Sequence, residues 1–497
     1  MRTRKAVVVG AGIAGLVAAV ELASAGIDVV VVERAATPGG KLRQIAIGDT
    51  RIDAGPTVFT MRFVFDAVFK AAGTTLEQHL KLVPAEILAR HAWNGTGHLD
   101  LFADIRRSAD AIGRFAGPAE ARGYLAFCER SRKIYRTLEA PFIKAQQPGS
   151  AFNLARRVGL LAPNDLLGMS PFATMWKGLA EHFHDPRLLQ LFGRYATYCG
   201  SSPWLAPATL MLVAHVEQAG VWMVEGGMHQ IARSFEALAK SKGAAFHYNA
   251  DVTEVLETRG HASGVQLASG ERIDADCVIF NGDAAALASG KTGRSAQRAI
   301  PPPDGARSLS ALTWTMTAKA QGFPLLRHNV FFSNDYASEF DDIFRHRRLP
   351  KTPTIYICAQ DRADTEADLD APERLLVLAN APATGDTTDF NAAGIAACEK
   401  ATFDLLHRCG LSLVRTAETT VITTPTQWNS LFPATGGALY GQATHGSMAP
   451  FRRPASRSKI PGLYLAGGSA HPGPGVPMAA LSGRLAAAAV LADKTRS

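Results

Sequence analysis

The sequence predicts an α/β protein in which separated segments of the chain build one parallel sheet, joined to a second, α+β domain. The chain has 497 residues, which is too long for one compact core and favours two or three structural units. Its first segment reads as strand, glycine turn, helix and strand, and its last segment as strand, loop and helix. A similar α/β pattern returns near residue 228, after a long apolar insertion.

The first elements are expected within residues 5–33. "KAVVVG" is a continuous β-branched run, as expected of a parallel strand that is buried on both faces. A helix is expected from Ile13 to Ala25 because Gly26 provides a good C-terminal glycine. "DVVVVE" then predicts a second buried strand over residues 28–33.

Gly10, Gly12 and Gly15 have the GxGxxG spacing of a dinucleotide-binding turn. The first glycine permits the turn, the second lets the backbone approach a pyrophosphate, and the third lets the helix pack closely on the strand. The phosphates would lie at the positive N-terminus of the helix, beside Ala14. The carboxylate of Glu33 would accept both ribose hydroxyls of an adenosine and would repel a 2′-phosphate, which argues against NADP. We therefore predict a Rossmann-like domain.

A second glycine pair, Gly39 and Gly40, lies in residues 35–75, which are expected to be irregular. Nicotinamide enzymes of this fold usually continue directly into another helix and strand. A flavin dinucleotide binds in an extended form, so its pyrophosphate and ribityl chain need a second close approach of the backbone. Lys41 and Arg43 would offset phosphate charge, with surface solvation as the alternative. Arg34 is a further residue expected to bind the cofactor.

The middle of the chain separates two α/β segments. From about residue 80 to 220 we expect a mainly helical region, in which the apolar residues 150–223 would line a tunnel. A helix over 228–240 precedes two short strands in "GAAFHYNADVTEVL", a hairpin-like pair and one buried strand in "SGVQLASGERIDADCVIFNGD". Residues 300–450 are mixed, with strands such as "TIYICA" and "RLLVLANAP", and the chain ends in an Ala-rich helix.

These segments predict two domains, each assembled from discontinuous pieces. Residues 1–75, 222–300 and 455–497 are expected to form the nucleotide-binding domain. Residues 76–221 and 301–454 are expected to form an α+β domain that contacts substrate and membrane through an apolar helical region.

Three motifs at the beginning, middle and end of the chain resemble the phytoene desaturase family, which is related to the amine oxidases. They are "DAGPTVFT" (53–60), "EGGMHQIARSFEALA" (225–239) and "GLYLAGGSAHPGPGVPMAALSG" (462–483). The resemblance implies FAD as the cofactor, an adenine contact from the backbone of Val252, and a C-terminal helix whose N-terminus faces the flavin pyrimidine. Ser469 stands where many relatives have an Asp. The further residues implied to bind FAD are Pro56, Thr57, Gly467, Gly468, Val476 and Met478.

The resemblance also implies an activity. It implies an FAD-dependent desaturase of carotenoid biosynthesis that introduces a C3,4 double bond into acyclic 1-hydroxycarotenoids, by hydride transfer to flavin N5 and loss of a proton. A phytoene desaturase, a carotenoid isomerase, an amine oxidase and a prenyl-binding protein without flavin are the alternatives. We assign no catalytic residue, because no acid–base or metal-ligating constellation is evident. His471, near the expected flavin loop, is interpreted as structural or cofactor-orienting rather than as a base.

Composition suggests partners besides the substrate. The net charge of +8 is diffuse and no nucleic-acid-binding motif accompanies it, so we predict no nucleic acid partner. An anionic membrane surface is the alternative, with basic clusters at 345–351 and 452–459 that could equally be solvated loops. The electron acceptor would be oxygen or a quinone.

Six scattered cysteines, without a CxxC pair or a signal peptide, predict free thiols and no metal site. We find no clean transmembrane helix in the sequence, because prolines and a glycine interrupt the uncharged stretch 195–216. The protein is therefore expected to be peripheral, on the cytoplasmic side of the inner membrane.

Overall fold

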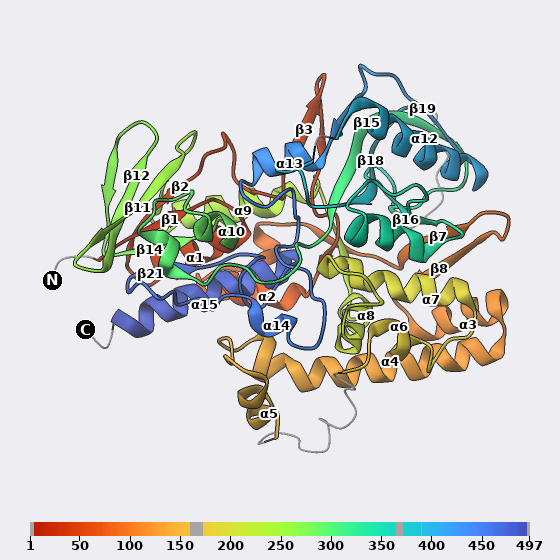
Figure 1. Ribbon diagram of the computed structural model, residues 1–497, viewed down its shortest axis with the longest axis horizontal. Coiled ribbons are helices and arrows are strands. Elements are labelled where there is room, and N and C mark those ends of the chain that lie inside the picture. Colours follow the sequence, from red (N-terminus) through yellow and green to blue (C-terminus); the bar gives the residue numbers. More distant parts are fainter. Residues whose placement is uncertain (1–3, 160–171, 364–370, 389, 495–497) are drawn as a thin grey trace.

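A five-stranded parallel sheet lies at the end of the molecule where both termini emerge, and it combines three distant parts of the chain (Figure 1). The computed structural model describes residues 4–159, 172–363, 371–388 and 390–494, so residues 160–171 of the predicted apolar insertion lie outside it. In order of pairing the strands are β10 (Ala245–His247), β2 (Asp28–Val32), β1 (Lys5–Val9), β14 (Cys277–Phe280) and β21 (Leu463–Leu465). The prediction of one sheet from separated segments is confirmed.

Both faces of this sheet are covered, which explains the continuous valine runs of β1 and β2. In the centre Val7 pairs with Val30 on one side and with Val278 on the other, and all the side chains from Ala6 to Val8 are fully buried. One face packs against three helices: α1 (Ile13–Ser24), α9 (His229–Ser241) and α15 (Val476–Lys494). The other packs against an antiparallel sheet of β11 (Val252–Thr258), β12 (His261–Leu267) and β13 (Arg272–Asp274).

Helix α15 runs beside α1 through the half of the molecule that contains the parallel sheet (Figure 1). Their backbones approach closely, since a Cβ added to Gly483 would lie 2.2 Å from the carbonyl oxygen of Ala14. By length and composition alone, the stretch Val476–Asp493 could cross a membrane, but 56% of it is buried inside the protein. The close packing on α1 identifies it as a core helix of this half.

The other half of the molecule is built on an eight-stranded mixed sheet. Its strands pair antiparallel except for the parallel pair of β7 and β16. The pairing order is β19 (Leu411–Val414), β15 (Ser310–Gly322), β18 (Glu373–Ala381), β17 (Ile355–Ala359), β16 (His328–Phe332), β7 (Ile87–Trp93) and β8 (His98–Phe102), with β20 (Thr420–Thr423) also on β15.

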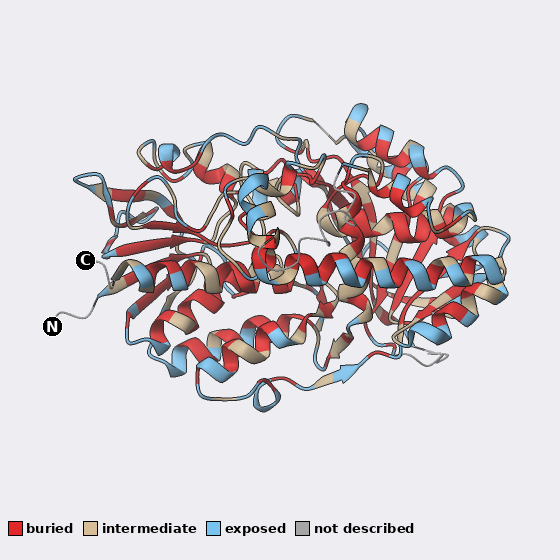
Figure 2. Cartoon of the chain, turned by 90° about the horizontal axis from the view of Figure 1, so that it is seen from below, coloured by how far each residue is buried: buried red, intermediate tan, exposed pale blue. Residues whose placement is uncertain are grey.

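Helices cover this sheet on both sides. A group next to β7, β8 and β16 forms one apolar core with them, and α12 (Ala392–Arg408) packs on the side of β15. Figure 2 shows the usual consequence, buried strands and outer helices whose residues alternate between buried and exposed. The first group comprises α3 (Ile105–Ala116), α4 (Pro118–Leu138), α6 (Met175–Leu179), α7 (Pro186–Gly193) and α8 (Leu212–Gln218). Shorter helices elsewhere are α5 (Ala151–Gly159), α10 (Ala284–Ala288), α11 (Tyr336–Phe340), α13 (Pro425–Leu431) and α14 (Ala449–Arg452).

Two sequence expectations need correction. Residues 35–75 were expected to be irregular, but they contain β3 (Gln44–Ile47), β4 (Thr50–Asp53) and the helix α2 (Arg62–Ala71). The helix forms because its apolar residues share one buried face, composed of Val64, Phe65, Val68 and Phe69. The expectation of helices over 80–220 omitted the strands at its start, where β7 and β8 form a hairpin in the mixed sheet.

The predicted domain boundaries remain a prediction. A small sheet of β5 (Phe59–Thr60), β9 (Val221–Val224) and β6 (Leu82–Pro84) joins segments from either side of them. The two halves are therefore continuous at this point, and the cavity described next lies between them.

Candidate functional site

A cavity of about 1190 Å³ extends between the two sheets. At one end it is lined by Glu33 and Val252, at the end of β2 and the start of β11. Its other end is lined by apolar residues of α4, α5 and α8 and by Tyr356 of β17. Of the residues predicted to bind cofactor, every one except Gly15 lines this cavity: Gly10, Gly12, Ala14, Glu33, Arg34, Gly39, Gly40, Lys41, Arg43, Pro56, Thr57, Val252, Gly467, Gly468, Val476 and Met478.

The glycine turn between β1 and α1 has the geometry that its spacing predicts. Gly10 has φ of +100°, which favours glycine, and Gly12 caps α1 without a side chain. A Cβ on Gly15 would lie 2.1 Å from the carbonyl oxygen of Gly10, so only glycine lets the helix approach the strand here. The cavity wall at this point is formed by Gly12, Ile13 and Ala14, the start of α1. A helix N-terminus with no capping side chain suits a phosphate group.

The second glycine pair lies directly on the first turn. The amide of Gly39 donates to the carbonyl oxygen of Ala11 at 2.8 Å, and a Cβ on Gly40 would lie 3.3 Å from the Cα of Gly12. Gly39 and Gly40 have φ of +121° and +58°. Residues of two backbone segments, 10–14 and 33–43, therefore form one wall of the cavity, as an extended dinucleotide would require.

Glu33 is held at the end of β2 by backbone amides. Its carboxylate accepts hydrogen bonds from the N–H of Ala11 at 2.7 Å and from the N–H of Ala35 at 2.8 Å, and Glu33 is 7% exposed. Burial raises the pKa of Glu33, and these two amides counteract the rise. The neighbouring Arg34 is exposed at the rim of the cavity. The carboxylate keeps acceptor capacity for ribose hydroxyls, since each oxygen has more than one lone pair.

Asn281 is a site residue that the sequence analysis missed. It follows β14, and its side-chain oxygen accepts a hydrogen bond from the amide of Gly15. Its side-chain nitrogen donates to the carbonyl oxygen of Ala466 at 3.4 Å, and its own amide donates to Val9 at 2.8 Å. One amide side chain thus joins the first glycine turn to the C-terminal loop. Its position directly after a buried parallel strand could have identified it, because ligands bind at the carboxyl ends of the strands in such sheets.

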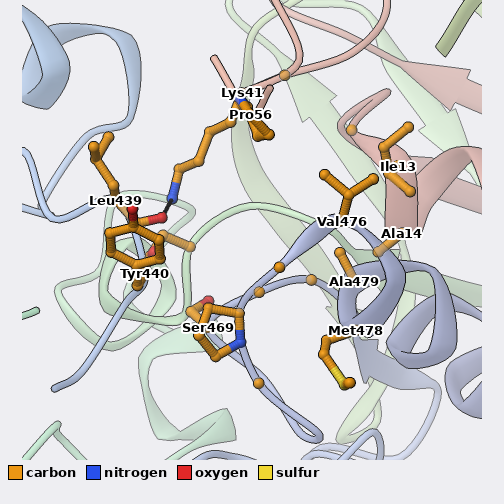
Figure 3. A pocket seen from close by; sticks show the side chains of 18 of the residues that line it. Ile13, Ala14, Lys41, Pro56, Leu439, Tyr440, Ser469, Val476, Met478 and Ala479 are labelled. Carbon is orange, nitrogen blue, oxygen red and sulfur yellow. Dashed lines mark hydrogen bonds between the residues drawn. The ribbon is translucent and has the colours of Figure 1, made fainter. Parts of the chain in front are cut away.

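The two predicted phosphate-neutralising cations have their charged ends near residues 428–440. The ammonium of Lys41 donates to the carbonyl oxygen of Leu439 at 2.7 Å, and Figure 3 shows it pointing toward Leu439 and away from Ile13. The guanidinium of Arg43 lies over the ring of Trp428 at 5.3 Å. Burial lowers the pKa of both residues. Their contact with phosphate stays a prediction.

Arg453 organises the C-terminal loop. The residue is 4% exposed, and its guanidinium donates to the carbonyl oxygens of Tyr440 at 3.1 Å, Gln442 at 2.8 Å and Gly468 at 2.9 Å. The sequence analysis grouped it with the basic cluster 452–459 as a possible membrane-binding or solvated cation, and that interpretation is wrong for Arg453. Its neighbour Arg452 is exposed, so a local charge pattern could not separate the two.

The loop after β21 ends at α15, whose first turn lines the cavity (Figure 3). Val476, Met478 and Ala479 of that turn form part of the wall, so the positive N-terminal end of the helix dipole lies at the cavity. The hydroxyl of Ser469 accepts from the amide of Ala284 at 2.9 Å, which joins the loop to α10.

His471 is structural, in agreement with its interpretation from sequence. Its Nε2 donates to the carbonyl oxygens of Phe142 at 3.0 Å and Ala145 at 2.9 Å, so it binds the C-terminal loop to the segment after α4. Burial lowers its pKa to about 4, which keeps the ring neutral. The side chain is 1% exposed and is not part of the cavity wall.

The motifs around Asp53 and Gly227 meet each other beside the cavity. The carboxylate of Asp53 accepts from the amide of Met228 at 2.6 Å, and a Cβ on Gly227 would lie 2.4 Å from that carboxylate. This contact fixes the turn that leads to Pro56 and Thr57 in the cavity wall.

The end of the cavity away from Glu33 has a largely apolar wall. Two strand residues, Leu376 and Leu378, face helical residues across it. Such a surface favours a long apolar ligand, at about 25 cal/mol for each Å² of apolar area removed from water. The helical and neighbouring residues are Leu138, Phe142, Ile143, Leu154, Leu210, Leu212, Val213 and Val216.

The residues present fit a flavin dinucleotide. The cavity joins an uncapped helix N-terminus, the buried carboxylate of Glu33 and a second helix N-terminus on one continuous wall. Added Cβ atoms at several glycines of that wall would meet backbone or Asn281 at 3.3 Å or less, so side chains are poorly accommodated at these positions. Among the described residues, no group of three His, Cys, Asp or Glu side chains could hold a metal ion.

Comparison with known proteins identifies the family. Residues 13–491 match the family model described as flavin containing amine oxidoreductase, and the chain belongs to this family. The chain is 56% identical to a hydroxyneurosporene desaturase of Rubrivivax gelatinosus over 99% of its own length and 94% of that protein. It is 43% identical to a hydroxyneurosporene desaturase of Cereibacter sphaeroides, over 98% of both chains.

Solved structures show the same fold at low sequence identity. Cyclohexylamine oxidase from Brevibacterium oxydans is 16% identical, with a TM-score of 0.56 over 99% of this chain and 100% of that one. The likeness confirms the predicted amine oxidase-like fold, a parallel Rossmann-like sheet with a mixed second sheet. The protein is a flavin-containing oxidoreductase.

Proposed function

We propose that this protein is an FAD-dependent desaturase that introduces the C3,4 double bond into acyclic 1-hydroxycarotenoids of the hydroxyneurosporene type. The observation that carries the proposal is 56% identity, over nearly the whole chain, to a hydroxyneurosporene desaturase. The cavity supports it, because one end suits a dinucleotide and the other suits an apolar chain.

Bound FAD supplies the acceptor for the hydride that leaves the carotenoid. The N-terminus of α1 and the glycine pair at 39–40 hold the diphosphate, and Glu33 holds the ribose. The N-terminus of α15 and the cations Lys41 and Arg453 provide positive potential at the other end of the coenzyme. The apolar wall holds the polyene and excludes water. We assign the proton acceptor to no residue.

The test uses purified protein, FAD and carotenoids presented in lipid vesicles. We expect 1-hydroxyneurosporene to lose two hydrogens between C3 and C4, as read by mass spectrometry and by the red shift of the longer polyene. Conversion of phytoene with 1-hydroxyneurosporene left untouched would refute the substrate assignment. Protein purified without any flavin absorbance, and unable to bind added FAD, would refute the coenzyme.

We further propose that the protein binds peripherally to the cytoplasmic side of the inner membrane. A net charge of +8 supports attraction to anionic lipid, and Phe152 and Phe172 are 75% and 90% exposed. Phe152 lies on α5, and Leu154 of the same helix lines the cavity. We expect flotation with anionic vesicles and weaker flotation of the Phe152→Ser/Phe172→Ser variant, with Phe63→Ser as the control, because Phe63 is a 40% exposed residue of α2. Equal flotation of all three proteins would contradict this.

Oxygen or a membrane quinone is the proposed electron acceptor. Anaerobic turnover with and without an added quinone separates them: turnover restored only by quinone identifies the quinone, and turnover that requires air identifies oxygen. Turnover with neither would refute both.

A further inference from the structure

The apolar end of the cavity contains polar groups that an unsubstituted hydrocarbon would not require. Arg194, Tyr198, Glu217 and Tyr356 line the cavity, and Tyr195 lies behind Glu217; these five residues are called the polar cluster. They come from the 3₁₀ helix η5 (Arg194–Cys199), from α8 and from β17. Because side chains three residues apart lie in line on a 3₁₀ helix, both tyrosines of η5 reach the same carboxylate.

Glu217 has unequal partners on its two oxygens. Tyr195, which is not in the cavity wall, donates to Oε2 in a short hydrogen bond. Tyr198, which is in the wall, donates to Oε1 at 3.4 Å, longer than the usual 2.5–3.0 Å of such bonds. Oε1 is therefore the oxygen on the cavity side, and it retains acceptor capacity for a ligand.

The charge of Glu217 is buried at a cost that its protein partners do not offset. The residue is 6% exposed, and burial raises its pKa. Within residues 4–159, 172–363, 371–388 and 390–494, no Lys, Arg or His forms an ion pair with it. Arg194 on the same wall favours the charged form of Glu217 but forms no ion pair with it. A buried carboxylate without an ion-pair partner destabilises a fold, so its presence in a largely apolar wall indicates a binding role.

Arg194 supplies donors on the same wall. Its guanidinium lies 5.6 Å from the ring centre of Tyr198 and 5.3 Å from that of Tyr356, and no carboxylate of a described residue forms an ion pair with it. A guanidinium carries five N–H donors and cannot accept. A group that both accepts and donates, such as an alcohol, would match Arg194 and Glu217 together.

The polar cluster is connected to the part of the wall expected at the flavin. The hydroxyl of Tyr356 is 2.6 Å from the hydroxyl of Thr57 and 2.7 Å from Nδ1 of His328. Burial lowers the pKa of His328 to about 3, so that ring is neutral. A ligand group bound at Arg194 would therefore lie near the segment Pro56–Thr57 and not at the far end of the tunnel.

We propose that Arg194, Tyr198 and Glu217 form the subsite for the tertiary hydroxyl of the carotenoid. Arg194 donates to the hydroxyl oxygen, Oε1 of Glu217 accepts the hydroxyl hydrogen, and Tyr198 orients Glu217. This inference rests on the function proposed above. Only one carbon separates the hydroxyl-bearing C1 from the C3–C4 bond, so the subsite determines which bond of the polyene reacts.

The test compares 1-hydroxyneurosporene with neurosporene, which lacks the hydroxyl, in vesicles with flavin-loaded protein. We expect the wild type to prefer the hydroxylated substrate in kcat/KM, by on the order of ten- to a hundred-fold, the usual effect of one or two hydrogen bonds to charged groups. The Arg194→Met and Tyr198→Phe variants should reduce this ratio toward one. A second readout is equilibrium binding of both carotenoids, followed by quenching of tryptophan fluorescence, in which the variants should weaken only the hydroxylated ligand.

Tyr124→Phe is the matched control, because Tyr124 is a buried tyrosine that accepts from Gln218 at 3.3 Å and does not line the cavity. It should leave the ratio unchanged. A wild-type ratio near one, or variants that are folded and flavin-loaded with an unchanged ratio, would overturn the subsite while the desaturase function stands. A wild type that converts neither carotenoid would overturn the function itself.

Discussion

Replacing Gly12 by alanine should separate flavin binding from folding. Gly12 has φ of −70° and ψ of 169°, which any residue can adopt, so the alanine backbone is unstrained. Its Cβ would meet only the end of the Asn281 side chain, at 3.2 Å, which can shift by a few tenths of an ångström. The apoprotein should therefore lose less than about 1 kcal/mol of unfolding free energy.

The same methyl group would stand on the wall where the phosphates approach. Overpacking at a close contact costs about 1–3 kcal/mol, so flavin affinity should fall by about ten- to a hundred-fold. Flavin titration followed by fluorescence quenching measures the affinity, and urea unfolding of the apoprotein measures the stability. Gly15→Ala is the contrasting variant, since its Cβ would lie 2.1 Å from a backbone oxygen, and it should lose stability itself. Wild-type affinity in Gly12→Ala, or equal destabilisation of both apoproteins, would refute the reasoning.

Three further predictions concern the loops that meet at the cavity. Asn281→Ala removes the bonds to Gly15 and Ala466 and should lower the unfolding free energy in urea by about 1–3 kcal/mol, together with flavin retention. Arg453→Met leaves three partly buried carbonyls without this donor and should lower the midpoint of thermal unfolding, whereas Arg452→Met at the exposed neighbour should not. Because burial lowers the pKa of His471 from 6.5 to about 4, the unfolded chain binds more protons in that interval. Stability should be full above pH 6.5 and fall as the pH decreases toward 4, with a maximum slope of about 1.4 kcal/mol per pH unit. His471→Asn should flatten the slope, and an unchanged profile would contradict the role of the imidazole.

Features that depend on local sequence were predictable. The valine runs of β1 and β2 indicate strands buried on both faces, because no residue in them can face water without penalty. Gly10 and Gly39 need backbone conformations that favour glycine, so their spacing carries information without any tertiary context. The C-terminal helix α15 begins at Val476, directly after the glycine- and proline-rich loop that predicts it.

Features that depend on distant partners were not predictable. Arg452 and Arg453 are adjacent and chemically identical, yet only Arg453 meets carbonyls from residues 440, 442 and 468. No local pattern marks Glu217 in the sequence. Its tyrosine partners lie 22 and 19 residues earlier in the chain, on another element. Helix α2 was not predicted, because the glycine-rich segment before it indicates turns. The helical spacing of its apolar residues could have predicted it.

Charged groups at two places along the cavity give the site a direction. Lys41, Arg453 and the N-terminus of α15 provide positive potential where the C-terminal loop lines the cavity, and among the described residues neither cation has an ion-pair partner. Burial lowers the pKa of both cations while the nearby Asp283 raises it, so an electron-rich ligand would stabilise their charged forms. At the second place, in the polar cluster, Glu217 provides a buried acceptor beside the donor Arg194. A coenzyme that gains electron density is therefore stabilised at the first place, and an alcohol group at the second. The polyene between them is neutral and is selected by shape and by burial, which is why its own recognition needs a polar group at one end.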